Sequence, residues 1–164
     1  MSVRLVYLDS SSIVKRYIEE SGSEVVDKVY AKAEATELRL AFSVWNIGEV
    51  LGVIDRYVSR GLLSEEVFKT TLLDFLSESA KMIRLGVLQM LPMTTKSLIE
   101  SWLLVMKYHI YESDALQIST LREADCSLLL SADSRLIQVA EKEGINIANI
   151  ESEPEKALVV LDMK

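Results

Sequence analysis

Five short apolar runs, separated by longer stretches with helical periodicity, limit the fold of this chain more than any other feature of its sequence. Strands that alternate with helices predict a parallel sheet with helices on both faces. We therefore expect an α/β fold with a central, mostly parallel five-stranded sheet. The predicted strands are Leu5–Leu8, Leu40–Ser43, Val87–Leu91, Ser127–Leu130 and Ile145–Ile150.

The stretches between these runs carry apolar residues at helical spacing and begin or end at residues typical of helix termini. The length of 164 residues fits one domain, which we expect over residues 1–150, followed by a C-terminal tail over 151–164. An apolar patch in that tail, Ala157–Leu161, predicts a strand or a helical turn. The predicted helices are Ser11–Glu20, Ser23–Ala35, Trp45–Ser59, Ser64–Lys81, Thr94–Tyr108, Glu112–Ala124 and Ser134–Glu143.

The balance of charges restricts the functions open to this chain. Its 18 basic and 25 acidic residues give a net charge of −7, which argues against a protein that coats nucleic acid by bulk positive charge. That charge does not exclude an enzyme that meets nucleic acid through metal ions. No apolar stretch approaches the roughly 20 residues that span a bilayer, and the run before Asp9 is too short for a signal peptide. Cys126 is the single cysteine and cannot form an internal disulfide, so we expect a cytoplasmic protein.

Two acids follow predicted strands directly. Asp9 comes after the first strand, and Asp133 comes after the fourth in the segment Ser131-Ala132-Asp133. Ligands of parallel α/β sheets bind beyond the carboxyl ends of the strands, so both acids are expected at one edge of the sheet. Each could instead cap the helix that follows it. Since three serines, Ser10 to Ser12, are available for capping, we expect that Asp9 is not needed as a cap, whereas Asp133 taken alone suits that role.

Two further acids lie on predicted helices. Asp114 falls in the first turn of its helix, where acids are common because of the helix dipole. Glu49 lies off the apolar stripe of its helix, which taken alone indicates a solvent-facing residue. Gly48 and Gly52 flank it, although each glycine costs a helix interior about 1 kcal/mol relative to alanine. Such glycines often permit close approach of a backbone or a ligand.

Other acid-bearing or nucleophilic sites fit the sequence poorly. An aspartyl-phosphate site requires an acid at position 11, which is serine, and no cluster of glycines follows a strand. The single histidine, His109, has no partner pattern for a serine triad, and one histidine with one cysteine makes a zinc site implausible. Carboxylate oxygens suit Mg²⁺ or Mn²⁺, and four acids near strand ends or helix starts therefore predict a site for such an ion.

Four segments present these acids in order along the chain, and their order and spacing resemble the motifs of the PIN-domain family, specifically VapC-type toxin ribonucleases of toxin–antitoxin systems. The resemblance covers nearly the full chain, from Leu5 to about Ile150. One departure is Glu112-Ser113, since Glu112 could substitute for Asp114 or add to it. The segments are Val6-Tyr7-Leu8-Asp9-Ser10-Ser11, Ser43-Val44-Trp45-Asn46-Ile47-Gly48-Glu49-Val50, Ser113-Asp114-Ala115-Leu116-Gln117 and Leu130-Ser131-Ala132-Asp133-Ser134-Arg135-Leu136.

The resemblance implies a metal-dependent endoribonuclease with a cognate antitoxin protein as partner and a homodimeric assembly. Ser10 and Ser131 would orient water or phosphate. The residues implied to hold Mg²⁺ or Mn²⁺, directly or through water, are Asp9, Glu49, Asp114 and Asp133.

Two alternatives stay open: a non-catalytic PIN-like binding or scaffold module, and a metal-dependent DNA nuclease. Retention of all four acids argues against the first, and the short chain argues against the second because DNA-threading enzymes usually need added helices. Basic residues near the motifs could contact phosphates or could be solvated surface charges; they are Lys15, Arg16, Arg56 and Arg135.

Overall fold

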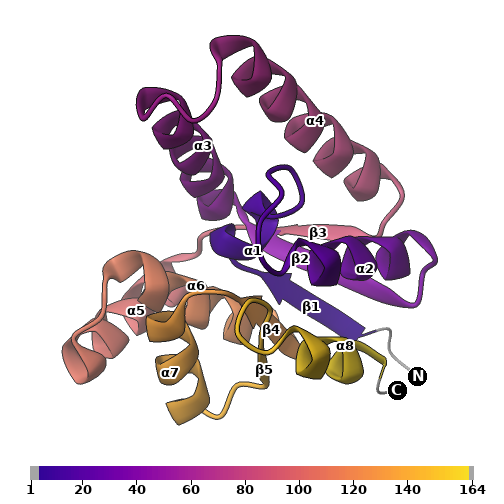
Figure 1. The fold of residues 1–164 in the computed structure, drawn as a ribbon. Coiled ribbons are helices and arrows are strands. Elements are labelled where there is room, and N and C mark those ends of the chain that lie inside the picture. The colour runs from indigo at the N-terminus through magenta and orange to yellow at the C-terminus, as the bar shows by residue number, and fades with distance from the viewer. Residues whose placement is uncertain (1–3, 163–164) are drawn as a thin grey trace.

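The computed structural model describes residues 4–162, which form a helix-covered sheet (Figure 1). The strands are β1 (Arg4–Leu8), β2 (Leu38–Ser43), β3 (Leu88–Leu91), β4 (Leu128–Ser131) and β5 (Ile147–Asn149). The helices are α1 (Ser10–Val14), α2 (Ser23–Glu34), α3 (Val44–Ser59), α4 (Glu65–Arg84), α5 (Thr95–Tyr108), α6 (Glu112–Glu123), α7 (Ser134–Lys142) and α8 (Pro154–Asp162).

The five strands form one sheet in the order β3-β2-β1-β4-β5, and every pairing is parallel. The predicted α/β class and five-stranded sheet are therefore confirmed. β1 lies at the centre, between β2 and β4, and its register pairs Leu8 with Leu130. The carboxyl ends of β1 and β4 consequently meet, although more than 120 residues separate them along the chain.

Alternation along the strands divides the core into two layers. Val6 and Leu8 of β1 pack with apolar residues of α1 to α4 and α8, whereas Tyr7 packs with α5, α6 and α7 on the opposite face. Both layers consist mainly of buried apolar side chains, as expected for a parallel sheet covered on both sides. In Figure 1, α3 and α4 project together beyond the sheet, while α5 and α7 lie on the other side of the strands' carboxyl ends.

The first predicted helix is shorter in the structure. The first helix ends at Val14 rather than Glu20, because the next residues make tighter turns in which Arg16 N donates to Ile13 O at 3.1 Å. Gly22 follows with a φ of 90°, and a Cβ there would lie 2.5 Å from Ile150 O, so only glycine fits. This glycine brings the start of α2 against the end of β5.

The apolar patch after residue 150 is helical. Ala157 and Leu161 of α8 are buried in the same core layer as α2, with exposed fractions of 0% and 5%. No helix within residues 4–162 combines the length and the apolar character that crossing a membrane requires.

Candidate active site

Asp9 occupies the middle of the sheet's carboxyl edge, directly after β1, and is 2% exposed. Its Oδ1 accepts a hydrogen bond from Ser12 N at 2.8 Å, so Asp9 is the N-cap of α1. The expectation that Asp9 is not needed as a cap is wrong, because the serines lie inside the first turn, and Ser11 Oγ donates to Asp9 instead, at 2.8 Å. Burial raises the pKa of this carboxyl, and hydrogen bonds from Ser131, Ser11 and Ser12 oppose the rise.

Ser131 links Asp9 to the end of β4. Its hydroxyl donates to Asp9 Oδ2 at 2.5 Å and accepts from Asp133 N at 2.9 Å. Asp133 is exposed and caps α7 through Oδ1, which accepts from Arg135 N and Leu136 N at 2.8 and 3.0 Å. Its Oδ2 makes no hydrogen bond within the described range. One carboxylate oxygen of Asp133 is therefore available to a ligand even though the residue also caps a helix.

Glu49 enters the site from α3, half-buried, and accepts a hydrogen bond from Ser10 Oγ. Ser10 Oγ itself accepts from Asn46 Nδ2 at 3.0 Å, so its single proton points to Glu49. Asn46 is fully buried; its Oδ1 accepts from Tyr7 OH at 2.7 Å, and its Nδ2 also donates to Gln117 Oε1 at 2.9 Å. This network fixes the orientation of the Asn46 amide and, through it, the direction of the Ser10 hydroxyl.

Sequence reasoning did not single out Tyr7, Asn46 or Gln117. A signal was present for two of them, since Asn46 precedes Glu49 by three residues and Gln117 follows Asp114 by three. Residues three apart share a helix face, so each amide lies beside an acid of the site. Asn46 also closes a capping box with the N-cap residue of α3, which ties it to the end of β2.

Asp114 lies in the first turn of α6 and is half-buried. Burial raises the pKa of Asp114 to about 6, and the charges of Asp133, Glu49 and Asp9 add to the rise, while Arg135 opposes it. The four predicted acids therefore share one electrostatic environment. This mutual repulsion is what a cation at their centre would relieve.

The donor set fits a hydrated divalent cation. Within residues 4–162, no three His, Cys, Asp or Glu side chains lie close enough together to form a ready-made metal cage. Mg²⁺ takes only one or two carboxylates directly and keeps several waters, so it does not require such a cage. The oxygens offered here belong to Asp9, Glu49, Asp114 and Asp133, and the chemistry suits Mg²⁺ or Mn²⁺ rather than a softer metal.

Glu112 is oriented away from this group of acids. Its carboxylate accepts a hydrogen bond from Ser101 Oγ of α5 at 2.5 Å, and it is exposed. Its charge is also not among the largest influences on the pKa of Asp114. Glu112 therefore offers a matched acid on the same helix turn for comparison with Asp114.

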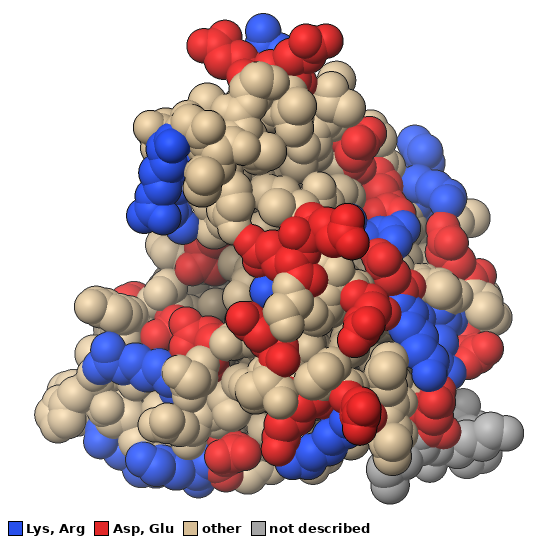
Figure 2. Space-filling model, viewed as in Figure 1, with Lys and Arg blue, Asp and Glu red and all other residues tan. Residues whose placement is uncertain are grey.

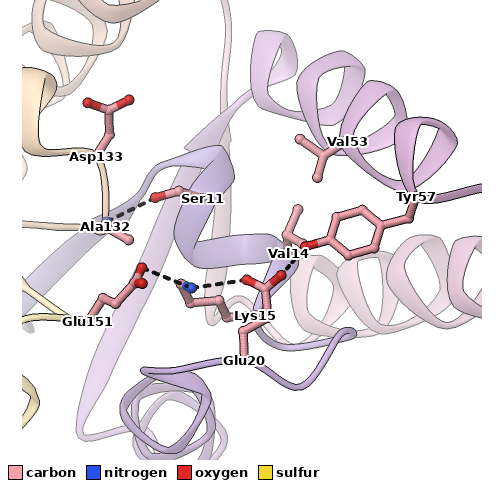
Figure 3. Close-up of a pocket in the computed structure, with 9 residues that line it drawn as sticks. All are labelled: Ser11, Val14, Lys15, Glu20, Val53, Tyr57, Ala132, Asp133 and Glu151. Carbon is pink, nitrogen blue, oxygen red and sulfur yellow. Dashed lines mark hydrogen bonds and ion pairs between the residues drawn. The ribbon is translucent and has the colours of Figure 1, made fainter. Parts of the chain in front are cut away.

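Two of the four basic residues near the motifs are engaged by carboxylates. Lys15 is 5% exposed, and its Nζ lies between Glu20 at 3.1 Å and Glu151 at 3.3 Å in a pocket of about 330 Å³ beside Asp133 (Figure 3). Arg16 is bound to carboxylates of α2 and α4 at 2.7 Å. Charges that are already neutralised contribute little to holding a phosphate, which leaves Arg56 and Arg135 as the candidates.

The fold and the site thus define a parallel α/β protein with a group of four carboxylates at the carboxyl edge of the sheet. The family model of the PIN domain matches residues 6–142, so the chain belongs to the PIN-domain family. The expected family is thereby confirmed. None of the curated proteins compared with the chain resembles it in sequence.

Solved structures with the same fold include toxins and toxin–antitoxin complexes. VapC20 of Mycobacterium tuberculosis, described as a sarcin–ricin loop cleaving toxin, is 12% identical with a TM-score of 0.59, covering 81% of this chain and 93% of that one. VapBC2 of Rickettsia felis, bound to a promoter DNA fragment, is 13% identical with a TM-score of 0.60, covering 88% and 97%. FitAcB of Neisseria gonorrhoeae is 16% identical with a TM-score of 0.60 and the same coverage. At these identities the likeness concerns the fold.

Proposed function

We propose that this protein is a metal-dependent endoribonuclease that hydrolyses RNA phosphodiester bonds and acts as the toxin of a toxin–antitoxin pair. The observation that carries the proposal is the meeting of four acids at the carboxyl edge of the sheet: Ser131 joins Asp9 to the backbone of Asp133, Ser10 donates to Glu49, and all three acids raise the pKa of Asp114. A folded chain that keeps four repelling carboxylates at one edge gains most by binding a divalent cation there. The family match and the fold shared with toxins support the toxin role.

Each acid and serine of the site would have a separate role in hydrolysis. Bound Mg²⁺ or Mn²⁺ would polarise the phosphate and lower the pKa of a water molecule. Asp9 and Asp114 would hold the ion, with Glu49 and Asp133 acting directly or through water. Ser131 keeps Asp9 oriented by its 2.5 Å hydrogen bond, and the network behind Glu49 keeps that carboxylate at the rim of the site.

The proposed partners are a cognate antitoxin and a second copy of the chain. Complexes of toxin and antitoxin occur among the structures that share this fold, including the Rickettsia felis and Klebsiella pneumoniae assemblies. A cytoplasmic location would accord with an RNA substrate. Coexpression with any short reading frame that adjoins this gene, followed by size-exclusion chromatography with light scattering, tests both partners.

The decisive experiment is RNA cleavage in Mn²⁺ and Mg²⁺ by the wild type, Asp9→Asn, Asp114→Asn and Glu112→Gln. Asparagine retains the capping oxygen of Asp9, so loss of cleavage in that variant reports on charge rather than on folding. We expect both Asp variants to lose at least 100-fold in rate, on the order of the contribution of a catalytic group, and Glu112→Gln to cleave like the wild type. Equal cleavage by all four proteins would disprove the site.

A further inference from the structure

A groove of about 430 Å³ runs from the acidic site along the exposed face of α3. Ser10 and Glu49 line its inner end, so it is continuous with the proposed site of hydrolysis. Trp45, Gly52 and Arg56 lie along the rest of it. These positions recur at helical spacing, so one face of α3 forms this wall.

Two glycines give the groove its depth. At Gly48, no atom lies within 4 Å of the position that a Cβ would take, and at Gly52 the nearest is Arg56 Nη1 at 3.7 Å. Neither glycine has a left-handed backbone, and both lie inside α3, where alanine is the more stable residue. Packing within the folded chain therefore does not require glycine at either position, and the open space above them is left for a ligand.

The two ends of this face carry an aromatic ring and a free cation. The indole of Trp45 is 39% exposed at the start of α3. Arg56 is exposed, and its guanidinium makes no hydrogen bond or ion pair with any residue from 4 to 162. An aromatic face and a guanidinium along one groove are a combination that binds single-stranded nucleic acid, through base stacking and phosphate contact.

The opposite side of the site repeats this pairing. Tyr111, before α6, is 71% exposed, and the guanidinium carbon of Arg135 lies 5.1 Å from its ring centre. In Figure 2, basic side chains flank a hollow, over α3 above and over α5 to α7 below, and acidic side chains lie inside it. This arrangement suits a strand whose phosphates meet cations on both sides of the acidic centre.

We propose that the α3 groove binds the nucleotide next to the cleaved phosphodiester, with its base stacked on Trp45 and its phosphate bound by Arg56. The inference rests on the proposed function and adds a binding site for the substrate. An exposed guanidinium that is unpaired within residues 4–162, in an acidic protein, favours a phosphate over an apolar protein segment. Because every base has a π-face, this subsite tolerates different bases, and selection among RNA sequences has to come from other contacts.

The test compares RNA cleavage by groove variants with that by matched surface variants. We expect Trp45→Leu and Arg56→Gln each to lower kcat/KM for RNA by about tenfold or more, the scale of one lost stacking contact. Trp45→Phe keeps a ring and should recover most of the rate. Trp102→Leu on α5 and Arg60→Gln after α3 lie outside the groove and should cleave like the wild type. The thermal shift caused by Mn²⁺ should be the same in the groove variants as in the wild type.

Gly52→Ala gives a variant whose stability and activity should change in opposite directions. The added methyl group favours the helix and should raise the melting temperature, while it reduces the groove and should lower RNA cleavage. Binding is read independently from Trp45 fluorescence in an Asp9→Asn, Trp102→Phe background, where a short RNA should quench the emission.

The outcomes separate the two proposals. If the wild type cleaves RNA and the Trp45 and Arg56 variants match it, the groove inference is overturned while the nuclease stands. If those variants cleave normally but escape inhibition by the antitoxin, the groove belongs to a protein partner and the inference is again overturned. A wild type that cleaves no RNA in Mn²⁺ removes both proposals.

Discussion

Replacing Asp114 by asparagine should make the metal-free protein more stable at neutral pH. Asp114 is held among three other acids and partly out of water, so its charged form is disfavoured in the folded state. An asparagine has the same shape and no charge. The variant should therefore lose the repulsion while keeping the packing of the first turn of α6.

The size of the effect follows from the pKa. A rise from 3.8 to about 6 corresponds to about 3 kcal/mol if taken in full. Because the carboxylate is only half-buried, solvent screening reduces this to about 1–2 kcal/mol. For a domain of this size, that gain raises the melting temperature by roughly 2–8 °C.

The direction with pH is fixed by linkage. A raised pKa means that the folded state holds the proton more tightly than the unfolded state, so the free energy of unfolding falls as pH rises from about 4 to 6 and stays low above that. Asp114→Asn should lack this part of the decline. Protons also compete with the cation at this carboxyl, so affinity for Mn²⁺ should weaken in the wild type as pH falls below about 6.

Urea unfolding at pH 4.5 and 7.5, in EDTA and with Mn²⁺, measures these differences, with Glu112→Gln as the control. The expected pattern is a variant whose gain in stability over the wild type appears in EDTA and is larger at pH 7.5 than at pH 4.5, while Mn²⁺ stabilises the wild type and Glu112→Gln but not Asp114→Asn. A variant less stable than the wild type in EDTA at pH 7.5, or one with the same decline from pH 4.5, would refute the reasoning.

Three further predictions concern the supports of the site. Asn46→Ala should cost about 3–5 kcal/mol, since it leaves a buried phenol, a backbone amide and an amide carbonyl without partners; urea unfolding measures the cost, and a loss below 1 kcal/mol would contradict the network. Ser131→Ala removes a hydrogen bond that lowers the pKa of Asp9, so protons should compete with Mn²⁺ more strongly in this variant. Measured by isothermal titration calorimetry as the pH is lowered, Mn²⁺ binding should be lost at a higher pH in the variant than in the wild type. Gly22→Ala should destabilise by more than about 2 kcal/mol because of its positive φ and the close carbonyl, whereas Gly86→Ala, with open space around it, should cost about 1 kcal/mol in thermal unfolding.

The sequence was sufficient to predict the layers of the fold because the apolar runs of the strands and the helical spacing of apolar residues between them are both strong signals. Short apolar runs such as Leu128–Leu130 are buried on both faces, and that burial makes parallel strands easy to recognise. The position of Asp9 and Ser131 at one edge follows from the same pattern. The order of the strands could not be predicted in the same way, because it depends on whether each connecting segment places the next strand on one side of β1 or on the other.

Hydrogen-bond partners were harder to predict from the sequence. Three serines after Asp9 look equivalent in a list of residues, but only a residue placed before the helix can cap it, and the helix begins at Ser10. Asn46 is a common polar residue whose role depends on three partners from distant segments, Tyr7, Ser10 and Gln117. Such networks depend on atomic positions that are precise to a few tenths of an ångström, and the spacing of residues in the sequence does not give these positions.

The central position of β1 has a consequence for how this protein is made. The strand that precedes Asp9 is synthesised well before its neighbour β4, since the Ser131 hydroxyl follows Asp9 by 122 residues. Asp114 and Asp133 are also late. A nascent chain therefore cannot assemble the acidic centre until residue 133 has emerged, and the long sequence separation makes that step a slow one. The proposed ribonuclease would in this way stay inactive while its own ribosome is still producing it.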